Sequence, residues 1–184
     1  MSEILGTLFK YLLALLAITA VVVVLYEALG SNKVSTAVSE VTTMQANISQ
    51  LYAGSTDYSG LSTTTIVDAK AAPSAMITST TTPAVGSTPA STSTSLNNPW
   101  GGTVAVAPDT TLANDDDITF NSVPADACAK LAASVSSAAQ ITINGTALTP
   151  SGTGASALNP ANIATNCAGG TNGVSTIVFT FPIS

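Results

Sequence analysis

The first 29 residues contain an apolar stretch that strongly limits the folds and environments open to this chain. Residues 12–25 carry no charge, and Lys10 and Glu27 are the only charged residues between residues 4 and 29. A helix of about 20 apolar residues spans the hydrocarbon core of a bilayer, and this stretch is long enough. We therefore predict either a retained membrane anchor or a helix buried on all sides in an assembly. A cleaved signal is disfavoured, because the start is not basic and no Ala-x-Ala site follows.

The helical pattern continues beyond the apolar stretch, but on one face only. The chain turns polar, while apolar residues recur at spacings of three and four. These positions are Val34, Ala37, Val38, Val41, Met44, Ile48 and Leu51. We predict one long helix whose apolar half is residues 1–30 and whose amphipathic half, residues 31–52, packs on a globular head. The alternative is a single-pass anchor followed by a short juxtamembrane helix.

The composition excludes several classes of function. The chain has no His, four basic residues against ten acidic ones, and a net charge of −6. Without His, neither Ser–His or Cys–His catalysis nor a His-based metal site can be built. The acidic balance disfavours nucleic acid, whose phosphates bind clustered Lys and Arg. We therefore predict no enzyme activity, no metal, no cofactor and no nucleic-acid partner.

Residues 31–184 are predicted to form one head of the α+β class, built on an antiparallel sheet. Alternating apolar and polar residues indicate strands at 102–107, 118–123, 140–143 and 173–181. Pro124 opens a predicted helix that ends near Val135. The long N-terminal helix would pack its second half on this sheet.

Two polar segments separate these elements. Residues 74–95 are dominated by Ser and Thr and contain prolines, which predicts an exposed loop or short irregular edge strands. The acidic run Asn114–Asp117 predicts a turn. A calcium loop is the weaker alternative for this run, because the usual ligand spacing is missing.

The two cysteines, Cys128 and Cys167, are predicted to form a disulfide. They lie 39 positions apart, which is too far for a CxxC redox or zinc motif. One even pair beyond an apolar anchor, in a chain with few charges, is typical of an exported domain. The alternative is two buried free thiols in a cytosolic fold.

Several short segments, taken in order, resemble the type IV pilins and in particular their type IVb branch. They are Ser31-Asn-Lys33, Ala37-Val-Ser-Glu-Val41, Leu51-Tyr-Ala-Gly54, Tyr58-Ser-Gly-Leu61, Asn98-Pro-Trp-Gly-Gly102-Thr-Val, Phe120-Asn-Ser-Val-Pro and Asp126-Ala-Cys128. They look like segments of bundle-forming and conjugative thin-pilus pilins, and the similarity covers nearly the whole chain. The resemblance implies an extracellular filament with apolar helices in its core and heads on its surface.

The family's usual Glu at the fifth mature position has no counterpart here. Position five is Leu5, and the only early carboxylate is Glu3. A carboxylate inside an apolar bundle needs a compensating cation, and the candidates are the amine of Met1 and Lys10. Lys10 lies on the same helix face as Glu3 but two turns away, so a pair between staggered neighbouring helices would set their register. The alternative is that both side chains reach the membrane surface.

From these features we expect a structural protein, the major subunit of a type IVb pilus that serves adhesion, bundling or conjugative mating contact. The expected partners are other copies of the chain, the inner membrane before assembly, and a host or recipient cell surface. The resemblance adds the prepilin peptidase and the pilus assembly machinery. The second hypothesis is a minor pilin, a secretion pseudopilin or a single-pass membrane-anchored binding module.

Overall fold

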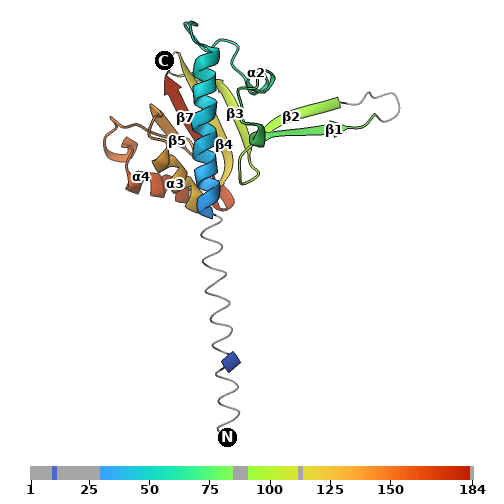
Figure 1. The fold of residues 1–184 in the computed structure, drawn as a ribbon. Helices are drawn as coiled ribbons and strands as arrows, with labels where there is room; N and C mark the ends of the chain where they lie inside the picture. The colour runs from blue at the N-terminus through green and yellow to red at the C-terminus, as the bar shows by residue number, and fades with distance from the viewer. Residues whose placement is uncertain (1–9, 12–29, 85–90, 112–113, 183–184) are drawn as a thin grey trace. The chain divides into compact units, whose positions relative to one another are not determined.

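The computed structural model describes residues 10–11, 30–84, 91–111 and 114–182. The chain divides into two units, Met1–Lys33 and Val34–Ser184. The second unit is an α+β head in which a helix lies on a seven-stranded antiparallel sheet (Figure 1). This is the predicted fold class.

The elements of the head follow the helix at residues 30–51. They are α2 (Thr63–Asp68), β1 (Ile77–Thr82), β2 (Ser91–Asn97), β3 (Thr103–Pro108), β4 (Asp115–Pro124), α3 (Ala125–Ser134), β5 (Gln140–Ile143), β6 (Thr146–Leu148), α4 (Pro160–Ala168) and β7 (Val174–Pro182). Single 3₁₀ turns lie at Ser74–Met76, Gly154–Ser156 and Thr171–Gly173. The strand order is β1-β2-β3-β4-β7-β5-β6, so the last strand of the chain is inserted between β4 and β5.

One face of the sheet is buried, and the strand register explains why. Leu96, Val104, Phe120, Ile177 and Ile143 form a row across five paired strands, and none is more than 3% exposed. Side chains alternate between the two faces of a strand, so the same register leaves the opposite face partly exposed. The alternation that predicted the strands therefore has the correct phase.

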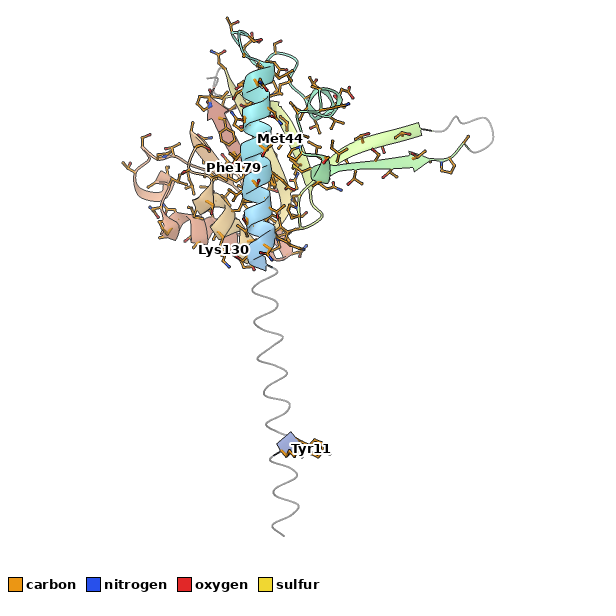
Figure 2. All side chains as sticks on the ribbon, in the orientation of Figure 1. Tyr11, Met44, Lys130 and Phe179 are labelled. Atoms are coloured by element: carbon orange, nitrogen blue, oxygen red, sulfur yellow. A yellow bond between two sulfur atoms is a disulfide. The ribbon has the colours of Figure 1, made fainter. Side chains whose placement is uncertain are left out.

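The helix at residues 30–51 contributes its apolar stripe to the same core. The buried positions are Val34, Ala37, Val41, Met44 and Ile48. Figure 2 labels Met44 on this helix and Phe179 on β7, which both belong to that core. Leu51, the last predicted position, is instead 46% exposed, because the helix ends there. Residues 34–51 are thus part of the head and not a separate juxtamembrane helix.

The acidic run near residue 115 differs from its prediction. Asp115, Asp116 and Asp117 are not a turn but the first residues of β4. Asp116 lies between Pro108 of β3 and Phe181 of β7 in the sheet. Aspartate is disfavoured in strands, but pairing with a strand on each side outweighs that propensity.

α2 was not predicted from the sequence, and the Ser/Thr-rich stretch after it is more regular than predicted. α2 begins after Ser62, whose hydroxyl accepts a hydrogen bond from the N–H of Thr65. Within the Ser/Thr-rich stretch, β1 and β2 form a regular ladder from Ile77–Leu96 to Thr82–Ser91. The predicted edge strands are therefore present, and they are longer and more regular than expected.

The disulfide expected from the sequence joins α3 to α4. Cys128 and Cys167 are both buried, and their Cα atoms are 5.8 Å apart. α4 extends to Ala168 and therefore contains Cys167. The bond thus links two helices.

Within the described ranges, no helix is both long enough and apolar enough to cross a bilayer. The apolar stretch that predicts the anchor lies almost wholly in residues 1–9 and 12–29, outside those ranges.

Candidate functional site

The outward face of the helix at residues 34–51 is uncharged. Its exposed positions are Ser35, Thr36, Ser39, Thr42, Thr43, Ala46, Gln50 and Leu51. The one charged residue in this range is Glu40, which is only 7% exposed. A neighbouring molecule with the same net charge can approach this face without direct charge repulsion.

Glu40 carries a carboxyl that is buried in the head. Its Oε2 is buried and makes no hydrogen bond with any residue that the structure describes. Burial raises the pKa of Glu40 from 4.5 to about 7, because the charged form loses its solvation. This carboxyl therefore keeps its proton to a higher pH than an exposed glutamate does.

A second carboxyl, that of Asp116, lies deeper, between the helix and the sheet. The side chain is fully buried, and neither oxygen has a hydrogen bond of regular geometry with a described residue. Burial raises the pKa of Asp116 from 3.8 to about 7, although Tyr58 and Gln45 nearby lower it and the charges of Asp117 and Asp115 raise it. The same cluster raises the pKa of Tyr58 to about 12, first through burial and then through the charge of Asp116.

Asp116→Asn is expected to stabilise the head at about pH 8 by about 2–4 kcal/mol, because each unit of pKa difference corresponds to about 1.4 kcal/mol. As the pH rises from about 4 to about 7, the unfolded chain loses the Asp116 proton and the folded chain keeps it. The free energy of unfolding therefore falls over this window and levels off above it. An amide of the same shape has no proton to lose. Urea unfolding of wild type and variant at several pH values measures the difference.

Glu40→Gln is the matched control for this experiment. Burial raises the pKa of Glu40 as it does that of Asp116. The Glu40→Gln substitution should therefore remove a separate part of the pH dependence of the free energy of unfolding. An Asp116→Asn head with the wild-type pH profile would show that Asp116 is ionised and solvated in the folded protein.

The segment Asn98–Gly102, between β2 and β3, is held together by one side chain. Oδ1 of Asn98 accepts hydrogen bonds from the N–H groups of Trp100 and Gly102, both at 3.0 Å. Nδ2 of Asn98 donates to the carbonyl of Asn121 on β4 at 2.7 Å. A Cβ at residue 102 would collide with that carbonyl, so only glycine fits. This segment is therefore a structural anchor for the end of β2.

A shallow cavity of about 370 Å³ lies at the end of the helix. It is lined by Asn47, Gln50, Leu51, Ala69, Lys70 and Ala71. Its polar side chains are those of Asn47, Gln50 and Lys70, and Asn47 already donates a hydrogen bond to the carbonyl of Ala71. A typical ligand site is instead a deep, mostly apolar pocket with a few convergent polar groups. Elsewhere in the part of the chain that the structure describes, no three His, Cys, Asp or Glu side chains could hold a metal ion.

Residues 31–182 match the family described as PilS N terminal, a range that includes the complete sheet, all labelled helices and the disulfide. The chain belongs to the PilS family of type IVb pilins. The family and the fold are those of a structural protein.

The solved structures that resemble this pilin include two of a pilin from Salmonella typhi. A crystal structure of a type IVb pilin from Salmonella typhi is 28% identical, with a TM-score of 0.59, over 80% of this chain and 99% of that one. An NMR structure of type IVb pilin (PilS) from Salmonella typhi is 29% identical, with a TM-score of 0.49, over 80% of this chain and 95% of that one. Among curated proteins, none matches the pilin.

The residues predicted to set helix register are only partly described. Lys10 is helical and exposed, while Met1 and Glu3 lie outside the described residues. A pairing between Glu3 and a cation therefore stays a prediction.

Asp116 and its neighbour Tyr58 were not predicted as a buried pair in this pilin. The spacing of the residues in β4 could have indicated that Asp116 points inward. Asp116 precedes Ile118 by two residues and Phe120 by four, so all three lie on the same, buried face of the strand. The run was predicted as a turn instead, since three successive aspartates favour a turn.

Proposed function

We propose that this pilin is the major subunit of a type IVb pilus and that residues 1–30 drive its polymerisation. The head completes its own core with the apolar stripe of residues 34–51. The uncharged residues 12–25 still require an apolar environment, which the bilayer provides before assembly and neighbouring helices provide afterwards. This second apolar segment is the observation that carries the proposal.

Repeated head-to-tail contacts without closure produce an open filament. The uncharged outward face of residues 34–51 supports such packing, because every copy carries a net charge of −6. Copies that repel each other overall need neutral surfaces at which to meet.

The proposal includes a route through the cell. The unassembled subunit would reside in the inner membrane, where it would meet the prepilin peptidase and the assembly machinery. It would then be incorporated into a pilus on the bacterial surface. The disulfide between Cys128 and Cys167 supports export, since disulfides persist in oxidising compartments. The filament would serve adhesion, bundling or mating contact, for which the Ser/Thr-rich exposed surface is suited.

The second candidate function is a minor pilin, a pseudopilin or a membrane-anchored binding module. Shearing cells and analysing the released material separates the two. A major subunit is the dominant protein of the sheared filaments, whereas an anchored module stays with the membranes.

Deleting residues 1–30 is expected to give a soluble, monomeric head. The remaining chain keeps the stripe of residues 34–51 that the core needs and loses the apolar segment. Circular dichroism and size-exclusion chromatography check the folding and the mass. Filaments formed by this truncated protein as readily as by the full chain would show that the deleted segment is not the assembly element.

A further inference from the structure

The strands β1 and β2 extend beyond the rest of the sheet as a two-stranded ribbon, which we define as residues 78–82 and 91–95. Figure 1 shows this pair leading away from the head, and Figure 2 shows its side chains on both faces. β1 and β2 pair along six residues, but β2 pairs with β3 only at Leu96 and Asn97. Residues 78–82 and 92–95 are all exposed.

The short helix α2 explains why the ribbon leaves the sheet. α2 contacts both β2 and β3. The hydroxyl of Thr63 accepts a hydrogen bond from the N–H of Val106 at 3.0 Å, on the β3 edge that β2 would otherwise occupy. β2 therefore separates from β3 beyond Leu96, and its edge along residues 91–95 has no strand against it among the described residues.

The ribbon thus has two different open edges, one on β1 and one on β2. β1 is the terminal strand of the sheet, so its outer edge has no strand partner in the described part of the chain. Open edges are templates for further strands, and proteins usually block them with charged residues. Here no charged residue occurs anywhere from residue 71 to residue 108, and every position of the ribbon is Ser or Thr.

Isolated two-stranded ribbons are at best marginally stable in water, so this one gains most from an additional strand. Its internal side-chain bonds are few and long, such as Thr81 to Thr92 at 3.3 Å and Ser93 to the carbonyl of Thr80 at 3.5 Å. Thr is a good strand former. Because the ribbon is uncharged, another copy of this acidic chain meets no local charge repulsion there.

We propose that the outer edge of β1 in one subunit pairs with the outer edge of β2 in a neighbouring subunit of the same filament. The two edges are unlike, so each copy uses one edge toward each of two neighbours. Such heterologous contacts repeat without closing, which is the symmetry that an open filament needs. The affinity would come from main-chain hydrogen bonds, as in other strand additions. This inference rests on the proposed polymerisation.

Co-assembly of two single-cysteine variants, Thr80→Cys and Ser93→Cys, tests the contact. Thr80 and Ser93 face each other within one ribbon. Because each variant carries only one of the two new cysteines, a cross-link between them can form only between two molecules. Sheared mixed filaments are treated with a short bis-maleimide, and linked dimers are identified by mass. The native cysteines are buried in their disulfide and do not react.

We expect linked dimers that contain one molecule of each variant, at about tenfold the level found when Ser93→Cys is mixed with Ser137→Cys, an exposed site in the α3–β5 turn. Mixed filaments with no dimer above this control level would overturn the strand pairing and leave the pilus assignment intact. Wild-type chains that form no filaments would contradict the proposed function itself.

A second pair of variants covers the case in which cysteine blocks assembly. Thr80→Val keeps the strand propensity and should leave filament yield near the wild-type level, whereas Thr80→Lys should lower it by about tenfold by charging the edge. Both variants should fold, because residue 80 is exposed. Wild-type yield for the Lys variant, or an equal loss for both variants, would rule out main-chain edge pairing.

Discussion

Cys128→Ser is expected to lower the free energy of unfolding of the head by about 2–5 kcal/mol. The disulfide joins α3 and α4 and closes a loop of 39 positions, for which the chain-entropy contribution is about 4 kcal/mol. Both half-cystines are buried, so the variant also leaves a buried hydroxyl at one position and a free thiol at the other. Fewer pili should follow, because less folded subunit is available.

Denaturant unfolding of the soluble head measures this loss. The control is Cys128→Ala with Cys167→Ala, which removes the bond without burying a hydroxyl and therefore isolates the contribution of the cross-link. A head whose unfolding midpoint is the same with and without the bond would show that packing of α3 on α4 holds the fold alone.

Glu3→Ala is expected to block filament assembly, or to reduce it strongly, while the head still folds. In the proposed filament core, the carboxylate compensates the amine of Met1 or the side chain of Lys10 in the same or a neighbouring copy. Removing one partner of a buried ion pair typically costs about 3–5 kcal/mol, and the loss recurs at every subunit. The head is unaffected because its core begins at Val34.

The measurement is the amount of sheared filament at matched levels of subunit in the membrane. The charge-reversed double variant, Glu3→Lys with Lys10→Glu, should recover part of the assembly if the two side chains meet across copies. Normal assembly of Glu3→Ala would show that Glu3 is a solvated residue at the start of the helix.

Local patterns predicted most of the head. Val34, Ala37, Val41, Met44 and Ile48 recur at the helical period and are buried in the core, whereas Val38 is only partly buried against it. β7 buries Ile177, Phe179 and Phe181 on one face, although Thr180 between them is buried as well. Pro124 stands immediately before α3, as expected. In the helix and in β7, the apolar residues that predict the element also supply its buried face.

The features that sequence reasoning missed depend on distant partners. Asp116 is a strand residue because β3 and β7 pair on either side of it, which composition alone does not reveal. The ribbon of β1 and β2 consists of Ser and Thr on both faces. It therefore shows no alternation of apolar and polar residues from which the length of the strands could be predicted. α2 is only six residues long, and its position depends on contacts with β2 and β3.

The predicted assembly residues are Met1, Glu3 and Lys10, and their pairing stays a prediction because Met1 and Glu3 lie outside the described residues. An early carboxylate and a nearby cation in an apolar helix indicate an ion pair, but a single sequence does not show whether the two groups belong to one copy or to two. The unlike edges of the ribbon became apparent only with the strand order, since pairing decides which edges stay open.

A helical reconstruction of sheared filaments at side-chain resolution tests the central claim most directly. The account predicts that this chain is the repeating subunit, that residues 1–30 of every copy pack together in the filament core, and that the heads form the surface. A filament built from another protein, or one in which these residues lie outside the core, would contradict it.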